Sequence, residues 1–104
     1  MLIQVNTDNH IPGHEELVKQ VEEAVSKALL RFESQITRVE VHLSDENGNK
    51  GGADDKRCVL EARIEGHQPV VASHQAETLK QAYTGAATKL KTALTHTLGK
   101  LSTY

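Results

Sequence analysis

The 104 residues are 38% hydrophobic and 25% charged with a net charge of −2, which indicates one globular domain spanning residues 1–104 and does not by itself suggest a nucleic-acid partner. The aromatic residues are Phe32, Tyr83 and Tyr104, too few for the single-strand readers that stack bases on aromatic side chains. The single cysteine, Cys58, excludes an internal disulfide, and the absence of a leader or a run of about 20 apolar residues predicts a cytoplasmic protein with no membrane partner.

The first half of the chain predicts a strand, a helix and a second strand. Residues 2–6 alternate apolar and polar side chains and predict a short strand. Residues 13–33 predict a helix, because apolar side chains recur every three or four positions. Residues 36–44 alternate again, which is typical of a sheet with one face packed and one face in water.

The second half predicts two more strands and a long helix. Residues 44–56 are polar and Gly-rich and predict a mobile loop. Residues 57–65 alternate with Cys58 on the inward side, and a short strand at 70–73 is expected to begin after Pro69, which lacks a backbone N–H. From Ser73, a plausible N-cap, to Leu101 the apolar side chains follow the period of a helix.

The element order β-α-β-β-β-α predicts an α+β fold. The last three strands follow one another through hairpins, so they are expected to pair antiparallel, and the first strand crosses over through the first helix. Each helix has one apolar stripe and each clear strand one apolar face. The simplest arrangement is a two-layer fold, a four-stranded sheet with both helices on one face.

Charge is distributed unevenly along the chain. Residues 1–77 contain 8 Lys/Arg against 14 Asp/Glu, whereas residues 78–104 contain four lysines and no acid. On a helical wheel, Lys80 and Lys91 lie on one flank of the last helix and Lys89 and Lys100 on the other. The asymmetry indicates a polyanionic partner, although lysines beside a buried stripe are also compatible with simple solvation of that helix.

The layout resembles that of ribosome hibernation-promoting factors and ribosome-associated translation inhibitors. The likeness is carried by Phe32 closing the first helix, the strand Val39-Glu-Val-His-Leu, Val71-Ala-Ser, and a last helix with Lys89-Leu90 and Leu94. It implies a fold like that of double-stranded-RNA-binding domains. It further implies binding to ribosomal RNA of the small ribosomal subunit, in the channel used by messenger and transfer RNA, with repression of translation under stress.

The resemblance also implies which residues contact RNA. Lys89 matches the basic residue of the family's Lys-Leu pair, and Lys27 matches a basic position in the first helix. Lys80, Lys91 and Lys100 add positive charge to the last helix without a clear equivalent in the family. The chain departs from the family pattern where Thr78-Leu79-Lys80 replaces a common Asp-Met-Tyr, and where Thr92, Thr95 and His96 occupy positions that are often basic. Because it ends at Tyr104, we expect the short form of the family, without a further domain.

No motif predicts catalysis, a metal or a cofactor. The acidic loop beginning at Asp45 places Lys50 and Lys56 where a calcium-binding EF-hand needs Gly and Glu. The six histidines are scattered and none lies at zinc-ligand spacing from Cys58. We therefore expect neither an enzyme nor a small-molecule substrate. The alternative to a ribosome-binding factor is a divergent protein-interaction or regulatory module of the same fold, and the sequence leaves the oligomeric state open.

Overall fold

The computed structural model describes residues 1–8, 11, 14–46 and 55–101, with the side chains of 14 and 99–101 left out. In chain order the elements are strand β1 (Leu2–Thr7), helix α1 (His14–Ala28), a 3₁₀ turn η1 (Leu30–Phe32), strands β2 (Ile36–Asp45), β3 (Lys56–Ile64) and β4 (Val70–Ala76), and helix α2 (Leu79–Leu101). This order confirms the predicted β-α-β-β-β-α arrangement and the α+β class.

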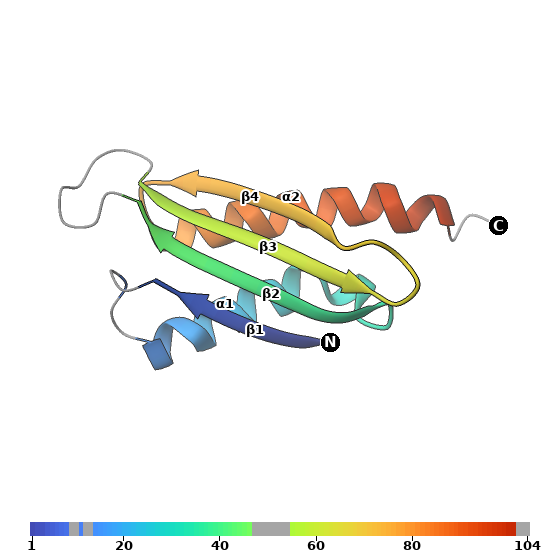
Figure 1. The fold of residues 1–104 in the computed structure, drawn as a ribbon, viewed down its shortest axis with the longest axis horizontal. Coiled ribbons are helices and arrows are strands. Elements are labelled where there is room, and N and C mark those ends of the chain that lie inside the picture. Colours follow the sequence, from blue (N-terminus) through green and yellow to red (C-terminus); the bar gives the residue numbers. More distant parts are fainter. Residues whose placement is uncertain (9–10, 12–13, 47–54, 102–104) are drawn as a thin grey trace.

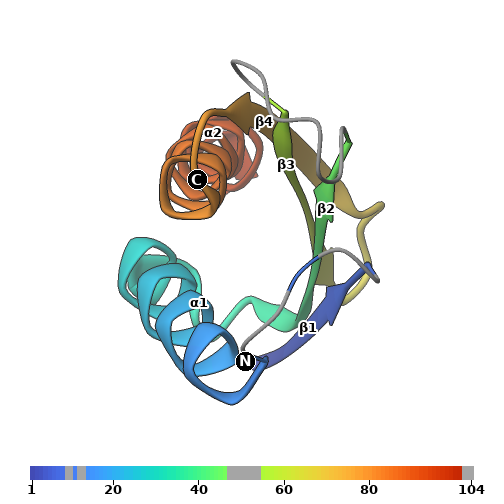
Figure 2. The same cartoon turned by 90° about the vertical axis from the view of Figure 1, so that its left-hand side faces the viewer.

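The four strands form one sheet in the order β1-β2-β3-β4 (Figure 1). β1 pairs with β2 in parallel, as a strand that returns through a crossover helix does, and the other two pairings are antiparallel hairpins. Seen end-on, the sheet curves around both helices, with α1 on the side of β1 and α2 on the side of β4 (Figure 2). The prediction that both helices cover one face is confirmed.

The core lies between the sheet and the helices and is almost entirely aliphatic. The inward residues of β2 and β3 and the apolar stripe of α2 are fully buried, and Phe32 and Tyr83 are the aromatic members of the cluster. β2 therefore has one buried face and one face toward solvent, as its alternating sequence predicted. Representative side chains with no exposed surface are Val21, Val25, Leu29, Val39, Val41, Leu60, Leu90 and Leu94.

The predicted end of the first helix was wrong by several residues. The α-helix stops at Ala28, and the chain tightens into η1, where the amide of Phe32 donates to the carbonyl of Leu29, 2.9 Å away. A 3₁₀ turn rotates its side chains relative to an α-helix. Phe32 in this turn is nonetheless in the core, 4% exposed, on the side that the apolar stripe of the helix predicts.

The predicted boundary between the last strand and the last helix was also wrong. β4 does not end at Ser73 but continues to Ala76, where it pairs with Lys56 of β3. Helix α2 begins at Leu79, and its N-cap is Thr78, whose hydroxyl accepts from the amide of Gln81 at 3.1 Å. Hydrogen bonds to β3 hold residues 74–76 in the strand. The sequence prediction, which took everything after Ser73 as one helix, did not include these bonds.

The loop predicted at 44–56 is shorter at both ends. β2 reaches Asp45 and β3 begins at Lys56, and these two residues face each other across the ladder. The Lys56 ammonium lies 3.5 Å from Asp45 and 2.9 Å from Asp55. The predicted mobility concerns residues that fall mostly in 47–54, outside the described part of the chain.

Candidate nucleic-acid interface

A groove of about 730 Å³ lies between α1 and α2, and residues of both helices line it. The two helices pack on different parts of the sheet, α1 on β1 and α2 on β3 and β4, and they also contact each other. The groove is lined by Gln20, Glu23, Ala24, Lys27, Ala28, Lys80, Tyr83 and Thr84.

Two of the predicted lysines meet at this groove from different helices. Lys27 lies in the last turn of α1, where positive charge is favourable to the helix dipole, and Lys80 lies in the first turn of α2. Both side chains are exposed, and within the described residues neither forms an ion pair. Two lysines that form no ion pair in the described structure therefore flank one concave surface, which Glu23 also lines.

The floor of the groove is apolar and small. Ala24 and Ala28 are half-buried one helical turn apart, and Tyr83 of α2 is only 4% exposed. Burial raises the pKa of the Tyr83 phenol, so its hydroxyl stays protonated near neutral pH and can donate a hydrogen bond. Among the described residues no group hydrogen-bonds to that hydroxyl, which is thus available to something in the groove.

The remaining lysines do not all join this site. Lys91 is exposed and lies eleven residues, close to three full turns, after Lys80, so it extends the same flank of α2. Lys89 follows Gly85 by four residues, and Gly85 packs against His74 of β4, so Lys89 lies on the opposite flank. Lys100 lies in the last turn of α2, with its side chain outside what the structure describes. Lys27 and Lys80 therefore line the groove, Lys91 continues the flank of Lys80, and Lys89 lies on the other flank of α2.

The outward face of α2 is neutral because threonines occupy it. The hydroxyls of Thr88, Thr92 and Thr95 donate to backbone carbonyls one turn earlier, at 3.1 Å to Thr84, 3.1 Å to Thr88 and 2.8 Å to Lys91. These hydroxyl protons are satisfied within the helix. Positive charge on α2 is thus confined to its flanks, as the sequence indicated.

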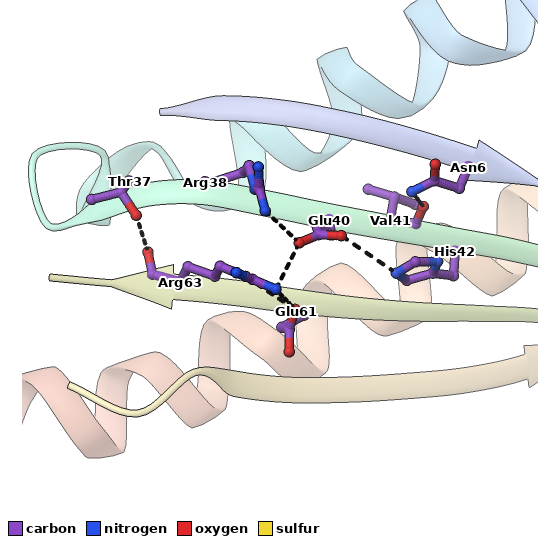
Figure 3. A network of polar contacts seen from close by, with 8 residues as sticks. All are labelled: Asn6, Thr37, Arg38, Glu40, Val41, His42, Glu61 and Arg63. Carbon is purple, nitrogen blue, oxygen red and sulfur yellow. Dashed lines mark hydrogen bonds and ion pairs between the residues drawn. The ribbon is translucent and has the colours of Figure 1, made fainter.

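The opposite face of the molecule, the open face of the sheet, carries charges that neutralise one another (Figure 3). Glu40 contacts both Arg38, at 2.9 Å, and Arg63, at 3.0 Å, and Arg63 also contacts Glu61 at 3.3 Å. Arg63 is therefore paired with two acids, Glu40 and Glu61. His42 approaches the same Glu40 carboxylate to 4.0 Å. Arginines on this face are therefore poor candidates for free phosphate-binding groups.

The other residues singled out in the sequence have structural roles. Cys58 is fully buried, and burial raises the pKa of its thiol to about 12, so it is not a nucleophile. Arg31 stacks over the ring of Phe32 at 5.6 Å from the centroid. A hydrogen bond from Lys56 to Asp55 raises the pKa of the Lys56 ammonium. In the part of the chain that the structure describes, no three His, Cys, Asp or Glu side chains gather as a metal site would require.

Sequence reasoning missed the floor of the groove. Tyr83 was read as a member of the buried stripe of α2, and Ala24 as part of the stripe of α1, and both readings are correct as far as they go. A signal was present, because Ala24 precedes Lys27 by three residues and Lys80 precedes Tyr83 by three, the spacing of neighbours on a helix surface. Nothing in the two separate helices, however, indicated that these surfaces face each other.

Comparison with known proteins extends over nearly the whole chain. A family model described as sigma 54 modulation protein / S30EA ribosomal protein matches residues 3–102. The N-terminal domain of Protein Y from Thermus thermophilus has a similar structure, with a TM-score of 0.73, 18% identity, and coverage of 93% of this chain and 99% of that one.

A second solved structure, a ribosomal subunit interface protein from Coxiella burnetii, is similar to the same degree. Its TM-score is 0.72 at 16% identity, and the match covers 95% of this chain and 99% of that one. At such identities both likenesses establish the fold. None of the curated protein sequences compared with the chain matches it. No helix in the described residues is both long and apolar enough to cross a bilayer.

Proposed function

Because the chain belongs to the sigma 54 modulation protein / S30EA ribosomal protein family, we propose that it binds the small ribosomal subunit and represses translation by occupying the channel for messenger and transfer RNA. The membership confirms the resemblance that the sequence indicated. The proposal is of a cytoplasmic RNA-binding domain spanning residues 1–104 that acts by occlusion, with no catalytic step and no cofactor.

The observation that carries the proposal is that Lys27 and Lys80 line one groove from two helices and that neither forms an ion pair in the described structure, although Glu23 lines the same groove. Arg38 and Arg63 on the sheet are instead paired with Glu40. A polyanion is attracted to the uncompensated charges and gains little from those already paired. The helix side of the molecule is therefore the side that faces RNA, and the sheet faces away.

The interface has a main part and a lateral part. Lys27, Lys80 and Lys91 lie along the groove and its continuation, and they form the main part. Lys89 lies on the other flank of α2 and forms the lateral part, which would contact RNA only if the binding surface wraps around that helix. Lys100 follows Lys89 by eleven residues, and the helical period predicts the same flank for it. Because a folded helix presents the lysines at fixed spacing, little conformational entropy is lost when they bind phosphate.

Co-sedimentation with purified small subunits through a sucrose gradient at low salt tests the proposal. Wild type should travel with the subunits, and Lys27→Glu combined with Lys80→Glu should leave the protein at the top of the gradient. Lys19→Glu is the matched control, since Lys19 is an exposed α1 residue that does not line the groove. Lys89→Glu measures how far the surface extends around α2.

Salt dependence gives a second readout. Each phosphate contact contributes roughly −0.7 to −0.9 to the slope of a plot of log affinity against log salt concentration. Replacing one contacting lysine by Gln should therefore make this plot less steep by about that amount. A wild type that stays at the top of the low-salt gradient, or a groove double variant that sediments as well as wild type, would refute occlusion. The protein-interaction reading, which the neutral threonine face of α2 favours, would then replace it.

A further inference from the structure

The groove between α1 and α2 has features that binding to the phosphate backbone does not require. Backbone binding needs only positive charge on a surface. Here the charges flank a concave site of about 730 Å³, within the 300–1,000 Å³ or so that small-ligand sites occupy. Its floor is apolar and includes a phenol hydroxyl. These additions call for a ligand with a flat apolar part as well as a phosphate.

We propose that the groove receives one unpaired nucleotide of the bound RNA, with its base on the floor and its phosphate between Lys27 and Lys80. The inference rests on the proposed function and specifies what that site recognises. Nucleotides in loops and bulges expose their bases, and proteins that read RNA in sequence mostly bind bases of this kind. A duplex, whose bases are stacked inside, could reach only the lysines.

The floor has the shape for a base. Ala24 and Ala28 lie one turn apart on α1 and are half-buried, so the surface between the helices is open where longer side chains would fill it. Tyr83 bounds the floor from α2 and is 4% exposed. A base in this position would remove apolar surface of Ala24 and Ala28 from water, which favours binding without any further charge.

The polar groups of the groove are complementary to a nucleotide as a whole. Lys27 and Lys80 are donors for phosphate oxygens, and the Tyr83 hydroxyl has no partner among the described residues. Glu23 also lines the groove, and it has no ion-pair partner in the described structure. An isolated phosphate would be repelled by that carboxylate, whereas a base can donate to it, since a carboxylate only accepts hydrogen bonds. Guanine suits Glu23 best, because the Watson–Crick edge of an unpaired guanine carries two kinds of N–H donor, the ring N–H and the amino group.

The experiment compares two RNA hairpins of equal charge and with the same terminal loop, by fluorescence anisotropy at constant salt. One has a single bulged guanosine in its stem, and the stem of the other is fully paired. Wild type should bind the bulged hairpin roughly tenfold more tightly, a preference in the range that a contacted base supplies. Ala24→Leu fills the floor without changing charge and should abolish the preference while leaving affinity for the paired hairpin unchanged. Tyr83→Phe, which keeps the ring and removes the hydroxyl, should reduce the preference several-fold.

Lys89→Gln is the matched control, because Lys89 lies on the other flank of α2. This substitution should change the affinity for both hairpins by the same factor, so that the preference for the bulged hairpin stays as in wild type. Circular dichroism establishes that each variant is folded, and Ala28→Leu serves as a second filling variant. Free guanosine monophosphate is the third probe. It should compete only weakly, since it lacks the flanking phosphates; competition stronger than that of the bulged hairpin would assign the groove to a free nucleotide and overturn the proposal.

Equal binding of the two hairpins by wild type, or a preference that survives both filling variants, would also overturn it. Either result is compatible with ribosome co-sedimentation of the wild type, in which case the proposed function stands and only the nucleotide site is lost. Failure of the wild type to sediment with the small subunit would instead count against the proposed function itself, so the two failures are distinguishable.

Discussion

The imidazole of His74 lies directly against the backbone of Gly85, so that a Cβ atom at position 85 would come within 2.7 Å of both Cγ and Nε2 of the ring. Side-chain carbons do not approach a ring so closely in folded proteins. The absence of a side chain at this one helical position therefore allows α2 to pack closely on the edge strand β4. The contact also orients α2, which fixes which of its flanks turns toward α1.

Gly85→Ala should therefore destabilise the protein, by about 1–2 kcal/mol in a chemical denaturation experiment. Overpacking costs roughly 1–3 kcal/mol, and alanine returns up to about 1 kcal/mol of helix propensity. The control is the same change in a His74→Ala background, where the clash is gone and only the propensity gain remains. Gly85→Ala should then be stabilising. The same sign in both backgrounds would show that the ring does not limit the approach of the helix.

Thr78→Ala should cost about 1 kcal/mol of unfolding free energy, because the Thr78 hydroxyl caps the amide of Gln81 at the start of α2. Ser73→Ala is the matched comparison. Ser73 was the N-cap expected from sequence, but it is an exposed residue in the middle of β4, so its hydroxyl should contribute less than about 0.5 kcal/mol. Thermal denaturation of the two variants side by side decides between the two caps, and a larger effect at Ser73 would contradict the assigned boundary.

Cys58 should be unreactive in the folded protein. Burial raises the pKa of the thiol from 9.0 to about 12, so about one thiol in ten thousand is ionised at pH 8, and the sulfur is also inaccessible. A disulfide-exchange reagent at pH 8 should label the native protein only as fast as it unfolds, and should label it at once in denaturant. Rapid labelling without denaturant would contradict the burial of this side chain.

The same shift has a consequence for stability at alkaline pH. Below about pH 9 the thiol is protonated in both the folded and the unfolded chain, so it causes no pH dependence. Between about pH 9 and pH 12 the unfolded chain loses this proton first, which favours unfolding as pH rises. The free energy of unfolding should fall over that window, and Cys58→Ala should show a shallower fall than wild type.

Glu40→Gln should destabilise the sheet by roughly 1 kcal/mol, which is more than an isolated surface ion pair provides. Glu40 bonds two arginines and its side chain is only 16% exposed. In the ladder Arg38 lies opposite Arg63, and Glu40 lies opposite Glu61, so like charges face each other across the two strands. The contacts of Glu40 with both arginines offset the repulsion between Arg38 and Arg63. Without Glu40, Arg38 has no acidic partner within the part of the chain that the structure describes.

Glu61→Gln provides the comparison, because Arg63, at 3.3 Å, is the one charged group that Glu61 contacts among the described residues, and because Glu61 is more exposed than Glu40. Its replacement should cost less than about 0.5 kcal/mol. Raising the salt concentration to about 0.5 M should reduce both costs. Neither change should alter ribosome co-sedimentation, since this face lies opposite the groove, and loss of binding in Glu40→Gln with the fold intact would place RNA on the sheet.

The type and order of the elements could be predicted because each carries a local signal. The alternation around Val41 and the helical stripe around Leu90 are produced by burial of one side of each element, and both residues are fully buried. The boundary between β4 and α2 could not be predicted, because residues 74–76 have no strong preference of their own. Pairing with β3 sets their conformation, and β3 lies elsewhere in the sequence, so the local pattern around residues 74–76 does not reveal this pairing.

The lysines could be predicted individually but their grouping could not. The acid-free composition of α2 and the resemblance to the family identified Lys80 and Lys27 separately. Whether they share a surface depends on how far α1 and α2 rotate about their axes when they pack on the sheet, and periodicity gives the direction of the core but not the direction of the neighbouring helix. The contact between His74 and Gly85 is one of those that determine the rotation of α2.

The parallel pairing of β1 with β2 has a consequence for the order in which the protein assembles. β1 is at the edge of the sheet and pairs with β2 alone among the described strands. Each of its pairs, from Leu2 with Arg38 to Thr7 with Leu43, joins residues 36 positions apart. The hairpin of β3 and β4 closes between Ala62 and Val70. Closing the longer loop costs more chain entropy, so β3 and β4 pair early and β1 docks last. The same strand is the first whose amides open to solvent when the folded protein fluctuates.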